Sequence, residues 1–263
     1  MTDALETGNA HTCFHLDGRV TLVTGASRGL GAETAVALGE AGAKVILLSR
    51  TEKELDQVAE RVGAVGEGAT VLVCDITNVA KLRSAIASLE RLDVLVNNAG
   101  TNIPEPFVGV SEEHLDQQLA LNVRAAFLVA QASVRKMLEA PDRRERGGSV
   151  INITSQMGRV GAPLRTVYCM GKHAIEGLTK AMALELAPDN IRVNAIAPTF
   201  LDTPMTAPFL AKPEVREWVL SRIPLGRIGQ LREVTGAVVF LASPASSLIT
   251  GASLAIDGGW TAQ

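Results

Sequence analysis

The sequence is poor in aromatic residues and contains a single tyrosine, Tyr168. Phe, Trp and Tyr make up 3% of the 263 residues, although hydrophobic residues as a whole make up 47%. A core of this composition must be filled by Val, Leu, Ile and Ala, which suits parallel strands covered by helices on both faces. The composition therefore favours a soluble α/β protein with one sizeable core.

Cysteine, histidine and long apolar runs are also scarce. The three cysteines are scattered and form no Cys-x-x-Cys pair, so neither a disulfide framework nor a zinc site is predicted. The four histidines have no metal-ligand spacing, and we expect no bound metal. No apolar run approaches the roughly 18 residues of a membrane-spanning helix, and residues 1–15 have no signal-peptide character. The sequence thus predicts a cytoplasmic protein.

The sequence also lacks a large excess of either charge. It has 25 Lys and Arg against 28 Asp and Glu, a formal net charge of −3. Nucleic acids and anionic membranes attract basic surfaces, and this balance gives no such electrostatic signal. The expected partner is a small molecule.

Short apolar segments alternate with segments of helical periodicity along the chain. The helices are predicted at residues 30–41, 52–62, 79–89, 112–138 and 172–186, and the strands at 20–24, 44–48, 70–74, 94–97, 149–154, 192–196 and 253–256. This alternation predicts right-handed crossovers and a doubly wound parallel sheet of the Rossmann type. Without a repeat or linker, residues 1–263 are predicted to form one domain, with 1–16 as an N-terminal extension.

Two segments interrupt the alternation. Residues 141–148 are highly charged and are expected to form a solvated loop. Residues 198–224 form a long connection with five prolines and helical character around 213–220. Connections of that length are usually functional, so we predict a substrate-binding loop or lid there.

The first predicted strand runs into a glycine-rich turn, Thr24-Gly25-Ala26-Ser27-Arg28-Gly29-Leu30-Gly31. Glycine permits a tight turn and lets the backbone approach a pyrophosphate, which the N-terminus of the next helix also attracts. Because the turn lies between a strand and a helix, it predicts a dinucleotide site.

The end of the second predicted strand indicates which dinucleotide binds. NAD sites usually place an acidic residue there to bind the ribose 2′-hydroxyl. This chain has Ser49 and Arg50 instead, with Arg28 in the glycine turn. Two guanidinium groups suit a 2′-phosphate, so NADP(H) is the predicted cofactor and NAD(H) stays possible.

The motifs together resemble those of the short-chain dehydrogenase/reductases. The resemblance covers residues 17–260 and rests on Thr24-Gly25-x-x-x-Gly29-x-Gly31, Asp75, Asn97-Asn98-Ala99-Gly100, Asn122, Ser155, Tyr168-x-x-x-Lys172 and Arg192-Val193-Asn194-Ala195-Ile196-Ala197-Pro198. Residues 223–227 and 256–260 are most similar to gluconate 5-dehydrogenase-like and 3-oxoacyl-carrier-protein reductase-like members.

The resemblance implies a seven-stranded sheet and a homotetramer with its main interface around residues 112–138 and 172–186. It places Asp75 near the adenine, and Asn97 and Gly100 along the cofactor groove. One departure is Thr199, where the family commonly has glycine beside the nicotinamide. The full predicted cofactor set is Gly25, Ser27, Arg28, Gly29, Leu30, Gly31, Ser49, Arg50, Asp75, Ile76, Asn98, Ala99, Gly100, Tyr168, Lys172, Pro198, Thr199, Leu201 and Thr203.

The predicted catalytic residues are Asn122, Ser155, Tyr168 and Lys172. Tyr168 and Lys172 are four residues apart and therefore share one helix face. A free tyrosine has a pKa of about 10, and a nearby ammonium group with the oxidised nicotinamide is expected to lower it for proton transfer. Ser155 is predicted to orient the substrate oxygen. By resemblance, Lys172 also binds the nicotinamide ribose, and Asn122 positions a water that links Lys172 to solvent.

The predicted reaction is reversible hydride transfer between the nicotinamide and a ketone or secondary alcohol. The candidate substrate residues suit a polar keto compound, a sugar acid or a 3-oxoacyl group, and they are Asn102, Gln156, Arg165, Met205 and Phe209. One alternative is a catalytically silent NADP(H)-sensing regulator, which would be expected to have a broken Ser/Tyr/Lys set. An epimerase or dehydratase would normally need a longer chain.

Overall fold

A seven-stranded parallel sheet forms the centre of the protein, whose computed structural model describes residues 12–263. The strand order is β3-β2-β1-β4-β5-β6-β7, so it reverses between β1 and β4. The strands are β1 (Val20–Thr24), β2 (Lys44–Ser49), β3 (Ala69–Val73), β4 (Val94–Asn97), β5 (Gly148–Ile153), β6 (Ile191–Pro198) and β7 (Ser253–Ile256). The predicted doubly wound α/β fold is confirmed.

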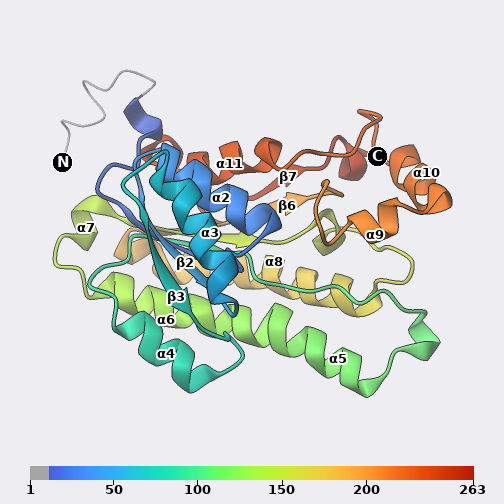
Figure 1. The fold of residues 1–263 in the computed structure, drawn as a ribbon, viewed down its shortest axis with the longest axis horizontal. Coiled ribbons are helices and arrows are strands. Elements are labelled where there is room, and N and C mark those ends of the chain that lie inside the picture. The colour runs from blue at the N-terminus through green and yellow to red at the C-terminus, as the bar shows by residue number, and fades with distance from the viewer. Residues whose placement is uncertain (1–11) are drawn as a thin grey trace.

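Helices cover both faces of the sheet (Figure 1). One layer contains α2 (Gly29–Glu40), α3 (Glu52–Gly63) and α11 (Arg232–Ala242). The opposite layer contains α4 (Val79–Ala87), α6 (Ala126–Leu138) and α8 (Thr166–Leu186). Each layer packs on its own hydrophobic cluster, and the sheet separates the two clusters.

The burial of β1 shows why its sequence is continuously apolar. Leu22 and Val23 are both fully buried, yet they belong to different clusters because successive side chains of a strand point to opposite faces. With helices on both sides, each face of the strand needs apolar residues.

Two helical predictions differ from the structure. The first turn of α8 begins at Thr166, so Tyr168 lies inside the helix that was expected to start at residue 172. The helix predicted at 112–138 comprises α5 (Glu112–Leu119), a π-helical segment Ala120–Ala125 and α6. A π-helix depends on backbone hydrogen bonding, which the side-chain pattern reveals poorly.

The charged segment 141–148 is not simply a solvated loop, and that prediction was wrong. It contains the short helix α7 (Arg143–Arg146), and Arg143 is 8% exposed. The Arg143 guanidinium lies 3.4 Å from Asp189, while Arg19 donates hydrogen bonds to the carbonyls of Arg146 and Gly147. These contacts bind the segment to the rest of the fold.

The predicted N-terminal extension 1–16 is only partly visible, since residues 1–11 lie outside the described part of the chain. Thr12–Phe14 form one 3₁₀ turn, and Leu16 is 1% exposed with its N–H bonded to the carbonyl of Ala41 at 2.7 Å. The end of this segment therefore packs on the domain. Across residues 12–263, no helix has the length and apolar character needed to cross a membrane.

The connection after β6 contains two short helices at one end of the molecule (Figure 1). They are α9 (Ala207–Leu210) and α10 (Pro213–Ser221). Met157, Val219 and Trp260 form a small buried cluster beneath them. This third cluster holds the predicted lid against the carboxyl ends of the strands.

Candidate active site

The glycine-rich turn lies where the strand order reverses, at the start of α2. Gly25 and Gly29 have φ values of +64° and +57°, a region that favours glycine. At Gly31 a side chain has no room, because a Cβ atom would collide with the carbonyl of Gly25 and the side-chain amide of Asn98. The turn therefore presents bare backbone at the N-terminus of a helix, a surface suited to a pyrophosphate.

The Asn-Asn-Ala-Gly motif after β4 is bonded directly to this turn. The Thr24 hydroxyl oxygen accepts hydrogen bonds from the N–H groups of Asn98 and Ala99, at 3.0 and 3.1 Å. The side-chain amide of Asn98 donates to the Thr24 carbonyl at 2.9 Å. The first asparagine, Asn97, is 5% exposed and donates to Ala126 at 2.9 Å, so its side chain joins β4 to α6 and does not line a groove.

Lys172 and Ser155 come together where β5 ends. The ammonium group of Lys172 donates to the carbonyl of Ile153 at 2.8 Å, and the side chain is 6% exposed. The Ser155 hydroxyl accepts from the N–H of Met157 at 3.1 Å and donates to Gln156 at 2.7 Å. Both groups are thus fixed by the last residues of a buried strand and the turn that follows.

Tyr168 lies on the first turn of α8, on the same face as Lys172. The Lys172 nitrogen is 5.6 Å from the centre of the tyrosine ring. Gly100 completes the cluster from the other side, because a Cβ atom there would lie 3.1 Å from Asn122 Oδ1 and 3.9 Å from Lys172 Nζ. The loop after β4, the π-helix and α8 therefore meet at this cluster.

The π-helix places Asn122 beside this point. Its Oδ1 atom accepts from the N–H of Thr101 at 2.8 Å, and its Nδ2 atom donates to the carbonyl of Thr101 at 2.8 Å. Asn122 is 3% exposed and joins the loop after β4 to the helix layer. Single-turn π-helices are often found at functional sites. The role of Asn122 in positioning a water stays a prediction.

Burial controls the acidity of the tyrosine and the lysine. Burial raises the pKa of Tyr168 to about 12, and interactions with Ser155 and Arg165 only partly oppose the rise. Burial lowers the pKa of Lys172 to about 8, and the charge of Glu176 opposes this change. The expected lowering of the Tyr168 pKa by Lys172 is not seen. At neutral pH the phenol is protonated, which suits a proton donor.

Glu176 is a residue of this site that the sequence did not single out. Its carboxylate accepts hydrogen bonds from the hydroxyl groups of Thr154 at 2.6 Å and Ser253 at 2.9 Å, and it is 8% exposed. The available signal was its position four residues after Lys172, on the same helix face. A buried carboxylate one turn from a buried ammonium group stabilises the charged form of the lysine.

The other end of the groove contains the predicted cofactor-selecting residues. Ser49 ends β2, and Arg28 and Arg50 are exposed. Within residues 12–263, neither arginine belongs to an ion pair of 4.0 Å or less. Hydrogen bonds from Thr77 hold the pKa of Asp75 below its usual value, and the positive charge of Arg50 contributes less to this change. Ile76 is buried, so it can contribute little more than backbone atoms.

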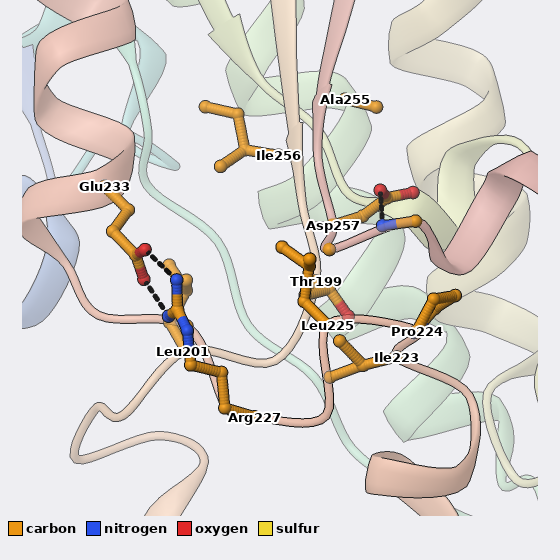
Figure 2. Close-up of a pocket in the computed structure, with 13 residues that line it drawn as sticks. Thr199, Leu201, Ile223, Pro224, Leu225, Arg227, Glu233, Ala255, Ile256 and Asp257 are labelled. Carbon is orange, nitrogen blue, oxygen red and sulfur yellow. Dashed lines mark hydrogen bonds and ion pairs between the residues drawn. The ribbon is translucent and has the colours of Figure 1, made fainter.

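A cavity of about 470 Å³ opens beyond the end of β6, and Thr199 and Leu201 line one side of it (Figure 2). Arg227 and Glu233 face each other in it with two bonds of 2.6 and 2.8 Å. None of Asn122, Ser155, Tyr168 or Lys172 is among its lining residues. The cavity therefore adjoins the predicted nicotinamide side of the site without containing the catalytic cluster.

The remaining predicted residues differ in their surroundings. The Thr199 hydroxyl is buried with no hydrogen-bond partner in the described chain, as is Oδ1 of Asn102. Arg165 packs on the ring of Phe209, with its guanidinium carbon 5.2 Å from the ring centre. Met205 is half exposed, and Thr203 forms a local turn by bonding to Thr206 at 2.9 Å.

Residues 25–261 match the family model described as enoyl-(acyl carrier protein) reductase. The chain is 36% identical over 249 residues to L-xylulose reductase of Bos taurus, which covers 95% of this chain and 99% of that protein. It is 38% identical over 250 residues to 3-oxoacyl-(acyl-carrier-protein) reductase FabG of Thermotoga maritima, with 94% and 99% covered. A gluconate 5-dehydrogenase from Burkholderia cenocepacia J2315, solved in complex with NADP and tartrate, superimposes with a TM-score of 0.91 at 34% identity, covering 97% and 100%.

The chain belongs to the short-chain dehydrogenase/reductase family. It is an oxidoreductase of that family, and its relatives include sugar dehydrogenases and reductases. The similarity extends over nearly the whole chain, from the glycine turn to the C-terminal segment, so the resemblance drawn from the motifs is confirmed.

Proposed function

We propose that the protein catalyses reversible hydride transfer between NADP(H) and a ketone or secondary alcohol, with Tyr168 as the proton donor and acceptor. The observation that carries this proposal is the convergence of Ser155, Tyr168, Lys172 and Asn122 from three separate segments at the carboxyl edge of the sheet. A helix-surface Tyr-x-x-x-Lys pair would not need a buried lysine whose ammonium group is bonded to the end of a core strand.

The glycine turn fits a dinucleotide because the absence of a Cβ atom at Gly31 lets the turn close against Gly25 and Asn98, so that the backbone at the start of α2 can approach a pyrophosphate. When bound, the nicotinamide supplies or accepts the hydride. In the reducing direction Tyr168 donates its proton to the substrate oxygen, and Ser155 donates a hydrogen bond that holds that oxygen. Lys172 stabilises the phenolate that remains, since its ammonium group lies over the face of the ring.

The preference for NADP(H) rests on the adenine end of the groove. No acidic residue ends β2, and Arg28 and Arg50 are exposed on the side where a 2′-phosphate would lie. The Burkholderia relative binds NADP. Turnover with NADPH and NADH, measured in parallel, tests the preference. A tenfold advantage for NADH would contradict it.

The substrate proposed from the site is a polar keto compound, a sugar acid or a 3-oxoacyl group. The relatives named above act on substrates of these three kinds, by their names. Oxidation of NADPH with a panel of ketones is the decisive assay. NADPH binding without turnover of any of them would favour the catalytically silent regulator instead.

The protein is further proposed to be a cytoplasmic, single-domain homotetramer with small-molecule ligands as its partners. One continuous sheet supports a single domain. Exposed apolar side chains on the two helices of the expected interface, Phe127 on α6 and Leu184 on α8, support self-association. Sedimentation of the protein at several concentrations tests the tetramer, and a stable monomer would contradict it.

A further inference from the structure

A buried guanidinium without an acidic partner lies one helical turn before Tyr168. Arg165 immediately precedes α8 and is 8% exposed. Its Nη1 atom donates to the carbonyl of Leu164 at 3.2 Å, and its buried Nε atom has no hydrogen-bond partner. No ion pair of the described residues includes Arg165. Burial of a charge without a counter-charge is unfavourable, so such groups usually have a partner.

The position of Arg165 connects it to the reaction and to the lid. Burial lowers the pKa of its guanidinium, and among the residues that the structure describes the titratable groups that act on it are Tyr168 and Cys169. Its other contact is with Phe209 of α9, whose ring centre lies 5.2 Å from the guanidinium carbon. Arg165 therefore stands between the catalytic tyrosine and the segment expected to cover the substrate.

The backbone before Arg165 is strained, and contacts from two sides hold it. Leu164 has a φ of +60°, a conformation that bulky side chains rarely adopt. Its carbonyl accepts from the N–H of Glu105 at 3.1 Å as well as from Arg165. The carboxylate of Glu105 binds His114 at 2.8 Å and leaves the guanidinium unpaired. Strain of this kind persists where the surroundings enforce a functional geometry.

We infer that Arg165 binds a carboxylate of the substrate, and that the substrate is a small oxo acid or the corresponding hydroxy acid. The inference rests on the proposed oxidoreductase function and narrows its substrate class. Arginine pairs with a carboxylate through two parallel hydrogen bonds, which would satisfy the unpaired Nε. Residues three apart on a helix have Cβ atoms about 5–6 Å apart, so the carboxylate and the reacting carbonyl belong to one compact molecule.

A substrate carboxylate bound by Arg165 excludes neutral sugars and 3-oxoacyl thioesters as preferred substrates. A neutral sugar offers only hydroxyl groups, which leave the charge of Arg165 uncompensated. A 3-oxoacyl thioester has no carboxylate near its ketone. The helix N-terminus that follows Arg165 adds a second favourable interaction with an anion.

The test compares oxo acids with their methyl esters, which have nearly the same shape without the charge. NADPH-dependent kcat/KM is measured for pyruvate, acetoacetate, levulinate and 5-oxogluconate, each paired with its ester. The natural protein is expected to prefer at least one acid. Arg165→Gln should lower the acid-to-ester ratio of kcat/KM roughly 10- to 100-fold. A loss of activity that is common to the acid and its ester does not change this ratio. Arg165→Lys should retain part of the ratio, and Arg83→Gln, a change at an exposed arginine of α4, should leave it unaltered.

The outcomes separate this inference from the proposed function. Turnover of ketones with no preference for any acid, or with the same ratio in Arg165→Gln, overturns the carboxylate assignment and leaves the oxidoreductase intact. If nothing is turned over, the proposed function fails. Calorimetric binding of 5-oxogluconate to the protein with NADP⁺ then decides the inference: loss of binding in Arg165→Gln supports it, and equal or absent binding refutes it.

Discussion

The two ends of the proposed cofactor groove are held in different ways. At the catalytic end, Asn122, Ser155 and Lys172 are each 6% exposed or less, and each is bonded to backbone that belongs to the core. At the adenine end, Arg28 and Arg50 are exposed. The groups proposed to transfer protons are thus fixed by the fold, whereas the side chains proposed to select the cofactor are exposed at the surface. Substitutions at the catalytic end should therefore have the larger effects.

The largest effect is expected for Tyr168→Phe. This change removes the only tyrosine hydroxyl of the chain while nearly preserving its shape. Loss of a general acid typically costs a factor of roughly 10²–10⁴ in rate. We expect turnover to fall by that amount while NADPH binding, followed by fluorescence, is retained. Near-normal turnover would show that Tyr168 is not the proton donor.

The backbone of the glycine turn is also fixed by the fold. Gly31→Ala tests whether the shape of this turn is needed for NADPH binding. The new methyl group has no space beside the Gly25 carbonyl, so the turn must shift. Overpacking costs about 1–3 kcal/mol, which predicts roughly 10- to 100-fold weaker NADPH binding if the strain falls on the binding turn. Gly63→Ala is the matched control, because a Cβ atom there meets nothing within 4 Å. Equal binding by both variants would contradict the prediction.

At the adenine end of the groove, where the side chains are exposed, we expect a smaller effect that distinguishes NADPH from NADH. Arg50→Ala should raise the KM for NADPH by roughly 10-fold, the value of one charge-assisted hydrogen bond, and should change the KM for NADH little. Arg83→Ala, at an exposed arginine of α4, is the control. If the two cofactors are affected equally, Arg50 does not bind the 2′-phosphate.

The smallest effect is a displaced pH profile in Glu176→Gln. Lys172 has a pKa of about 8 and is protonated below it, and the charge of Glu176 favours that form. Activity that needs the ammonium group falls as the pH rises through this value. Without the carboxylate the pKa decreases, so the descending limb of kcat against pH should move to lower pH. Glutamine retains a side-chain oxygen that can accept the hydrogen bonds from Thr154 and Ser253. If the descending limb of the pH profile does not move, Glu176 has only a structural role.

The sequence was sufficient to predict the sheet because its strands are short, apolar and clearly bounded. Val94–Asn97 and Ser253–Ile256 have the predicted limits. The glycine turn and the Tyr-x-x-x-Lys pair could be located as well, since their spacing is a local property of the chain. Arg165 and Phe209 were both predicted near the substrate, and the structure brings them into contact.

Other features depend on contacts between distant segments, and the sequence could not predict them. Asn97 looked like a groove residue, but its amide is used by Ala126 and Asn152 in the core. Glu176 looked like any surface glutamate until its partners from β5 and β7 were known. The pKa of Tyr168 is governed by burial, which a helical spacing does not report.

The π-helix at Ala120–Ala125 also changes how the surface on either side of it is oriented. A π-helical hydrogen bond spans one residue more than an α-helical one, i→i+5 in place of i→i+4, and one residue of an α-helix corresponds to about 100° of rotation. The apolar stripe of α6 is consequently out of phase with that of α5. A one-residue deletion in this segment would restore a regular α-helix, turn α5 around its axis, and withdraw Asn122 from Thr101. The length of this segment is thus a determinant of the site, independent of which side chains it carries.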